Sequence, residues 1–125
     1  KEYESTFGKS LESEEDYADA LRNLSHDYTI SVTVITAGSG AAYFCLEERV
    51  VRAFPPEIRS RNGVGSGDSL LAGWLAARQE GNDILPSIRR AMAAGAANAE
   101  QLGVASVDPD RVRQLEEKIL LNEVL

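Results

Sequence analysis

The segment from residue 62 to residue 73 constrains this chain most, because alternating glycines lead directly into an apolar helix pattern. Its sequence is Asn-Gly-Val-Gly-Ser-Gly-Asp-Ser-Leu-Leu-Ala-Gly. Glycines at 63, 65 and 67 allow backbone angles closed to other residues, so successive N–H groups can converge on one anion. The start of the following helix adds the positive end of its dipole. The turn therefore predicts an anion site, and phosphate is the anion that such a turn favours.

Asp68 lies at the start of the predicted helix, beside the expected anion. A carboxylate repels phosphate, so at this position it acts either as a chemical base or as a cap of the helix. One side chain can serve both purposes. Alternating glycines are a weak signal by themselves and leave both interpretations open.

Length, charge and hydropathy limit the remaining classes of function. The chain has 125 residues, enough for one modest core, and nothing in it indicates two domains. A net charge of −7 argues against nonspecific binding to nucleic acid or to anionic membranes. No apolar run approaches the roughly 20 residues of a membrane span, and the first residues do not resemble a signal peptide. We therefore expect a soluble, cytoplasmic protein with small-molecule partners.

The first half of the chain shows one helix pattern followed by three strand patterns. A capping box at residues 13–16 predicts a helix that ends near residue 26. The β-branched run at 29–36 predicts a central strand buried on both faces, which ends in a tight turn at 37–40. The segments 42–46 and 49–54 predict a hairpin around Glu47 and Glu48.

The second half is predicted to be helical. Helices are expected from Gly67 to about residue 80 and from about 84 to 102. The centre of the second helix, residues 91–99, has six alanines and one glycine. Such a helix either packs closely on a neighbour or leaves room for a flat ligand. Asp108 and Pro109 predict the start of a last helix that extends through Ile119 and Leu120.

The glycine turn and the helix behind it resemble a known family. Gly-x-Gly-Asp-Ser followed by Leu-x-Ala-Gly is similar to the signature near the C-terminus of the ribokinase-like (PfkB) sugar kinases. The resemblance implies an α/β fold: the C-terminal part of a three-layer α/β/α sandwich, with a strand hairpin and tightly packed small-residue helices. In such doubly wound folds, ligands bind beyond the carboxyl ends of the parallel strands.

The resemblance also implies a nucleotide site. Residues 34–38 are similar to the family's strand and turn that contact nucleotide phosphates and ribose, which implies contacts from Thr36, Gly38 and Ser39. The helix segment around Asn98 and the loop that contains Gly103 resemble segments that line the adenine pocket. Asn98 has an alternative role, because an asparagine on a small-residue helix can equally bond its own backbone.

The N-terminal residues resemble part of a second family motif, Lys-Pro-Asn-x-x-Glu, with Glu2 on the motif's glutamate. This implies that Glu2 helps to orient hydrated Mg²⁺. It also implies that residues 1–125 form a single partial domain, the nucleotide-binding C-terminal half of a sugar kinase without the sugar-binding half and lid. Removal of half of a sheet should expose an apolar strand edge, so we expect that such a piece can form a homo-oligomer.

The chemistry that the resemblance implies is phosphoryl transfer from ATP to a sugar hydroxyl. Asp68 would remove the hydroxyl proton, while the N–H groups of Gly65, Ser66 and Gly67 would hold the developing charge. Within the family, the sequences of these motifs are most similar to those of tagatose-6-phosphate kinases and 1-phosphofructokinases. This similarity implies a sugar phosphate as acceptor. The alternative is a noncatalytic module of the same fold that binds a nucleotide or serves assembly. By itself, the chain is expected to be inactive.

Overall fold

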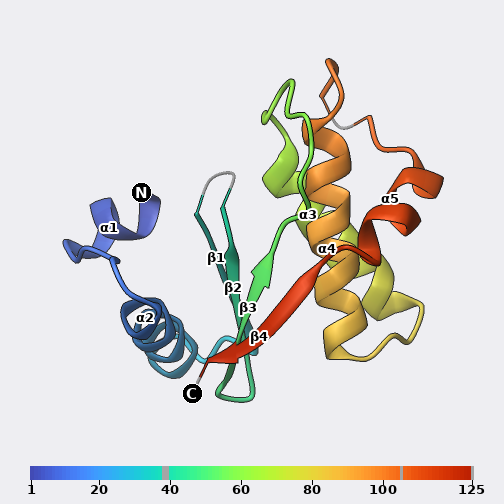
Figure 1. Cartoon of the computed structure of the whole chain (residues 1–125). Coiled ribbons are helices and arrows are strands. Elements are labelled where there is room, and N and C mark those ends of the chain that lie inside the picture. The colour runs from blue at the N-terminus through green and yellow to red at the C-terminus, as the bar shows by residue number, and fades with distance from the viewer. Residues whose placement is uncertain (38–39, 105, 125) are drawn as a thin grey trace. The chain divides into compact units, whose positions relative to one another are not determined.

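The computed structural model describes residues 1–37, 40–104 and 106–124 (Figure 1). The chain divides into two compact units, residues 1–52 with 122–125, and residues 53–121. Within the described ranges the elements follow the order α1 (Glu2–Phe7), α2 (Glu14–Asp27), β1 (Val32–Thr36), β2 (Ala42–Leu46), β3 (Arg49–Phe54), α3 (Ser66–Gln79), α4 (Ile84–Ala99), α5 (Pro109–Glu116) and β4 (Leu120–Val124). This mixture of helix and sheet confirms the predicted α/β class.

The first unit contains α2, whose start agrees with the predicted capping box. The Ser13 hydroxyl accepts a hydrogen bond from the Asp16 N–H at 3.1 Å, and the Asp16 carboxylate accepts one from the Ser13 N–H at 2.8 Å. These bonds satisfy donors that the first helical turn leaves without partners. The buried face of α2 then packs on the strands through a cluster of Ala18, Leu21, Tyr43, Cys45 and Val50.

The strands form one sheet in the order β1-β2-β3-β4. Strands β1 and β2 are antiparallel, with Val32 opposite Leu46 and Thr36 opposite Ala42. The prediction of a central position for β1 is wrong for this sheet, because β1 lies at its edge and the Val34 side chain is 37% exposed. β-Branched residues favour a strand, but they do not determine how many neighbours that strand receives.

The hairpin of β2 and β3 has the predicted bounds and an unusual turn. Glu47 and Glu48 have φ angles of 49° and 67°, in the left-handed region that glycine and asparagine prefer. A two-residue turn with positive φ at both positions is of type I′, whose twist matches that of the strands. The sheet therefore imposes on two glutamates a conformation that they would avoid in isolation.

We expect the substitution Glu48→Gly to stabilise the protein by about 0.5–1 kcal/mol, because glycine adopts the left-handed conformation without the steric cost of a Cβ atom. The midpoint of thermal unfolding would rise by a few degrees. An unchanged or lower midpoint would show that the turn stores no strain at this position.

The second unit is built on close contact between α3 and α4 (Figure 1). A Cβ atom at Gly73 would lie 2.8 Å from the Ala94 Cβ and 2.9 Å from the Arg90 carbonyl oxygen. A Cβ atom at Gly95 would lie 3.1 Å from the Ser66 carbonyl oxygen. The small residues of α4 thus serve helix packing, which was one of the two predicted uses. The other face of α4 meets α5 through a cluster that includes Ala93, Ala97 and Leu115.

Several element boundaries differ from the predicted ones. Helix α1 was not predicted, and α4 ends at Ala99 instead of near residue 102. The last helix is the clearest error: α5 ends at Glu116, and residues 120–124 form strand β4. Asp108 caps α5 as expected, since its carboxylate accepts the Asp110 N–H at 3.0 Å. The apolar residues after α5 fit a helical period, but the sheet offers them hydrogen-bond partners that a helix end lacks.

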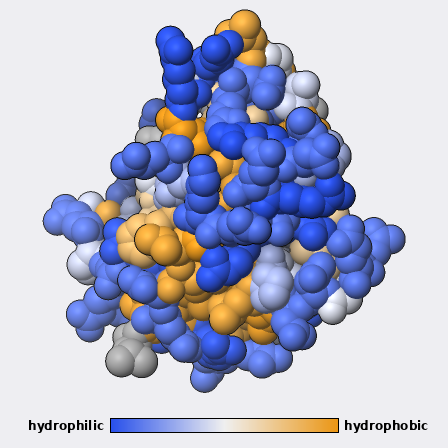
Figure 2. All heavy atoms as spheres, turned by 45° about the vertical axis from the view of Figure 1, so that its right-hand side comes forward, coloured by the Kyte–Doolittle hydropathy of each residue, from blue (hydrophilic) through white to orange (hydrophobic). Residues whose placement is uncertain are grey.

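Hydrophilic side chains dominate the face shown in Figure 2, with smaller apolar areas between them. Among the described residues, no helix combines the length and apolarity needed to cross a bilayer.

Candidate active site

The chain that leads into the glycine turn is anchored on the C-terminal end of α4. The Ala99 carbonyl accepts hydrogen bonds from the Arg61 N–H at 2.7 Å and from the Asn62 N–H at 3.1 Å. The Asn62 side-chain amide donates to the Leu102 carbonyl at 3.1 Å, and its oxygen accepts the Val64 N–H at 3.0 Å. The turn is therefore an ordered segment attached to a buried helix. Asn62 was not among the predicted site residues, although an asparagine before a glycine is a typical turn signal.

Gly65 is the glycine of this turn that has a left-handed backbone. It is the N-cap of α3, with φ 82° and ψ 0°. The sequence allows such angles at all three glycines of the turn, but Gly63 and Gly67 do not have positive φ. A Cβ atom at Gly67 would meet no atom within 4 Å. The fold thus requires glycine at 65, whereas at 67 it leaves open space beside the backbone.

The first turn of α3 presents backbone donors. The Ser66 N–H donates to the Gly63 carbonyl at 3.2 Å, so one of the three predicted anion donors is used within the turn. For the N–H groups of Gly65, Gly67 and Asp68, the described residues provide no acceptor. Free N–H groups at the positive end of a 14-residue helix form the kind of site that binds phosphate.

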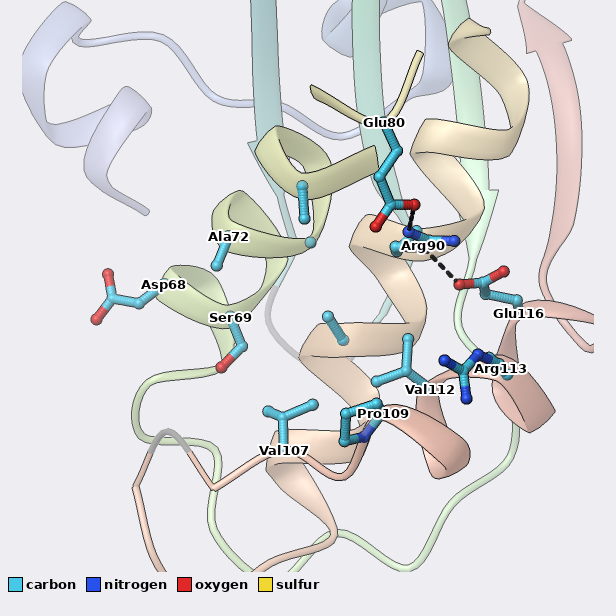
Figure 3. A pocket seen from close by; sticks show the side chains of 13 residues that line it. Asp68, Ser69, Ala72, Glu80, Arg90, Val107, Pro109, Val112, Arg113 and Glu116 are labelled. Atoms are coloured by element: carbon cyan, nitrogen blue, oxygen red, sulfur yellow. Dashed lines mark hydrogen bonds and ion pairs between the residues drawn. The ribbon is translucent and has the colours of Figure 1, made fainter. Parts of the chain in front are cut away.

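Asp68 lies in this same first turn, and its side chain is exposed. Within the described parts of the chain, its carboxylate accepts no hydrogen bond and forms no ion pair, so it does not act as a helix cap. Figure 3 shows the carboxylate directed away from the neighbouring Arg90, Glu80 and Glu116. Asp68 is therefore available to a ligand at the N-terminal end of α3.

A cleft of about 670 Å³ lies beside this helix, between α3, α4 and α5. Small and apolar residues form much of its lining, among them Ala72, Gly73, Ala76, Ala94, Val107 and Val112. Arg90 crosses one end and donates to Glu80 at 2.6 Å and to Glu116 at 2.8 Å (Figure 3). These hydrogen bonds, chiefly that to Glu80, raise the pKa of Arg90. Because two carboxylates already neutralise Arg90, the cleft is not built to bind an anion through this residue.

The structure places Asn98 behind the turn and away from its open face. The residue is fully buried, and its side-chain amide donates to the Val64 carbonyl at 2.9 Å and to the Ser66 hydroxyl at 3.1 Å. Direct contact between Asn98 and a nucleotide is therefore not supported. These two hydrogen bonds go to residues before and at the start of α3, not to the backbone of its own helix as the alternative held.

The other predicted site residues belong to both units of the chain. Gly103 is exposed in the segment after α4, whereas Thr36 and Glu2 are exposed in the first unit. Gly38 and Ser39 lie outside the described residues. Among the residues that are described, no group of three or more His, Cys, Asp or Glu side chains could hold a metal ion. The structure thus brings together Gly65, Ser66, Gly67 and Asp68, with Asn98 beneath them.

A paired carboxylate at the end of α4 helps to hold this region together. Arg111 of α5 donates to both oxygens of Glu100, at 2.8 and 2.6 Å. The Glu100 side chain is 16% exposed, so the pair is partly shielded from water. The hydrogen bonds from Arg111 lower the pKa of Glu100 below its ordinary value of 4.5.

We expect Glu100→Gln to destabilise the protein at neutral pH by about 1–2 kcal/mol, because a charge-assisted pair is lost. The folded carboxyl has the lower pKa, so its stabilisation is complete above the unfolded value of 4.5 and disappears as pH falls through the folded pKa. The urea midpoints of variant and wild type should therefore differ at neutral pH and converge as pH falls below 4.5 and through the folded pKa. Glu123→Gln is the control, because Glu123 pairs with Arg49 at 50% exposure. An equal acid sensitivity of the Glu100→Gln variant and the wild type would contradict this role.

The sequence and the fold both resemble those of characterised proteins. The profile described as pfkB family carbohydrate kinase matches residues 1–111. A 1-phosphofructokinase of Borreliella burgdorferi is 28% identical over 98 residues, which cover 78% of this chain and 32% of that protein. A 1-phosphofructokinase of Rhodobacter capsulatus is 27% identical over 108 residues, which cover 86% of this chain and 34% of that protein.

Solved structures share the fold. The crystal structure of a provisionally assigned phosphofructokinase from Staphylococcus aureus matches with a TM-score of 0.90 and 25% identity, over 98% of this chain and 39% of that one. Phosphofructokinase-2 from Escherichia coli, in complex with potassium, matches with a TM-score of 0.82 and 21% identity, over 93% of this chain and 38% of that one. The latter similarity supports the fold alone.

An α/β fold with a glycine turn at the start of a helix is typical of the ribokinase-like kinases. The chain belongs to the pfkB family of carbohydrate kinases. It spans about a third of the length of the curated relatives that it matches.

Proposed function

We propose that this chain provides the ATP site and the phosphoryl-transfer turn of a kinase that phosphorylates a hydroxyl of a sugar or sugar phosphate. The observation that carries the proposal is the first turn of α3. It combines unused N–H groups at Gly65, Gly67 and Asp68 with an exposed carboxylate that has no partner among the described residues. Membership of a carbohydrate kinase family supports the same assignment.

In this proposal, Asp68 accepts the proton of the acceptor hydroxyl while its oxygen attacks the γ-phosphorus of ATP. The free N–H groups of the turn donate to the transferring phosphoryl group, whose charge is spread over its oxygens. Because these donors belong to the backbone of an anchored turn, they need little reorganisation during the reaction. The Ser66 N–H contributes if it exchanges its long bond to Gly63 for one to phosphate.

ATP brings Mg²⁺, which would neutralise phosphate charge. Mg²⁺ is usually held by phosphate oxygens, water and one or two carboxylates. Glu2 is an exposed carboxylate, which is a type of group that such an ion can accept through water. We propose that Glu2 orients this ion through water. We also propose that the nucleotide is contacted by Thr36, Gly38, Ser39 and Gly103.

The acceptor class is inferred from the relatives. Two of them are named 1-phosphofructokinases, so we propose a phosphohexose, with tagatose 6-phosphate as a second candidate. The sugar-binding half would lie outside residues 1–125, which would make this chain a partial domain that is inactive alone. We further propose cytoplasmic action, where ATP and sugar phosphates are available, and association of copies through the exposed edge around Val34.

The test of this function is ADP release by the complete gene product with MgATP and a panel of acceptors. The panel contains fructose 1-phosphate, fructose 6-phosphate, tagatose 6-phosphate, ribose and nucleosides. Acceptor-dependent ADP release would establish the kinase and identify its sugar. Nucleotide binding without turnover on any acceptor would instead favour the noncatalytic module of the same fold.

Gly67→Ala provides a sharper test of where phosphate binds. A methyl group at this position meets no protein atom within 4 Å, so we expect the fold to accept it with a small gain in stability of about 0.5–1 kcal/mol. If the transferring phosphoryl group approaches the Gly67 backbone, the methyl group should displace it and lower kcat/KM by about 10-fold or more. Unchanged kinetics would mean that the phosphoryl group lies elsewhere.

A further inference from the structure

The phosphoryl-transfer turn depends on a support that lies behind it. In the proposed function its free N–H groups would face the phosphoryl group, so the shape of the turn must be maintained from the opposite side by the protein. That side is occupied by the C-terminal half of α4. Gly95 allows the Ser66 carbonyl to approach, and the Ala99 carbonyl accepts the N–H groups of Arg61 and Asn62.

Asn98 is exceptional in this part of α4. From residue 93 to residue 99, the helix otherwise contains only alanine and glycine. Asn98 is fully buried, and burial of an amide is unfavourable unless the amide forms hydrogen bonds. It donates to the Val64 carbonyl at 2.9 Å and to the Ser66 hydroxyl at 3.1 Å, on the two sides of Gly65. The amide therefore bridges the point at which the chain turns into α3.

We propose that Asn98 is a positioning residue for phosphoryl transfer, which rests on the function proposed above. By holding Val64 and Ser66 together, its amide maintains the left-handed conformation of Gly65 and the direction of the N–H groups at Gly65 and Gly67. In this role Asn98 acts on the reaction through the turn, without direct contact with nucleotide or sugar.

The inference distinguishes Asn98 from an ordinary core residue. Loss of a core residue lowers stability but leaves the chemistry of the folded fraction unchanged. Loss of Asn98 leaves the Val64 carbonyl and the Ser66 hydroxyl without this donor, so the turn should open locally. Misplacement of a catalytic group by about 1 Å can reduce turnover by about 100-fold.

The experiment compares Asn98→Ala with Ser87→Ala in the complete enzyme. Ser87 is a matched control, because it is also fully buried on α4, and its hydroxyl donates to the Asp83 carbonyl at 2.7 Å, at the other end of the helix. For Asn98→Ala we expect kcat to fall by about 10- to 100-fold with the KM for ATP changed by less than about 3-fold. For Ser87→Ala we expect unchanged kcat despite reduced thermal stability. Equal kcat in Asn98→Ala and wild type would overturn the proposal.

Two further measurements cover the other outcomes. If Asn98→Ala does not fold, Ser66→Ala removes one acceptor of the amide and should still lower kcat, and an unchanged kcat would then count against the proposal. Hydrogen exchange of the amides at residues 63–68 needs no turnover, so it remains informative even if the protein is not a kinase. Faster exchange of these amides in Asn98→Ala, but not in Ser87→Ala, would agree with the proposal that Asn98 positions the turn. Equal exchange in the two variants would refute it.

Discussion

Asp68→Asn in the complete enzyme is expected to lower kcat by about 10²–10⁴-fold, the usual contribution of a positioned general base. Asparagine has the size and polarity of aspartate but cannot accept the proton of the acceptor hydroxyl. The carboxylate forms no internal hydrogen bond or ion pair with the described residues, so its replacement breaks no bond of the fold. ATP affinity should therefore remain close to that of the wild type.

The measurement is steady-state ADP release with the preferred acceptor, together with nucleotide binding by calorimetry. Asp110→Asn is a suitable control, because Asp110 is also an exposed acidic residue in the first turn of a helix, but belongs to α5. It should retain full turnover. Near-normal turnover of Asp68→Asn would show that Asp68 only complements the dipole of α3.

Gly73→Ala is expected to destabilise the protein by about 1–3 kcal/mol, since overpacking at a closely packed contact forces neighbouring atoms apart. The added methyl carbon would lie 2.8 Å from the Ala94 Cβ and 2.9 Å from the Arg90 carbonyl oxygen. The second of these is backbone of α4, so relief requires the two helices to separate. Because α4 supports the phosphoryl-transfer turn, activity should decrease together with stability.

Urea unfolding of the complete protein measures this effect, and Gly67→Ala on the same helix is the matched control. In an ordinary helix position, replacement of glycine by alanine stabilises by about 0.5–1 kcal/mol, so the expected signs differ between the two sites. Equal effects of both substitutions would show that α3 and α4 can adjust to the additional methyl group.

Local signals predicted the elements whose geometry depends on neighbours in sequence. The hairpin at 42–46 and 49–54, the capping box of α2 and the Asp108 cap of α5 agree with the structure. The glycine turn also occurs at the start of a helix, as expected, with the helix beginning at Ser66. Each of these features depends on bonds or steric limits within a few residues, which the sequence shows directly.

The errors concern features that depend on distant partners. β-Branched residues favour a strand at residues 32–36 but do not reveal that it lies at the edge of the described sheet. Residues 120–124 are compatible with a helical period, and their pairing in the sheet makes them a strand. The direction of the Asn98 side chain also depends on distant residues, because its hydrogen-bond acceptors lie 32 and 34 residues away in the chain.

For this protein, then, the sequence by itself determined the family resemblance, the glycine turn and the identity of the candidate base, because these depend on residue type and short spacing. The tertiary structure decided which N–H groups have no acceptor among the described residues, which glycine has a left-handed backbone and which buried side chain forms hydrogen bonds to the turn. Those properties arise when α3 packs on α4, since close approach of two helices allows only small side chains and requires a partner for every buried polar group.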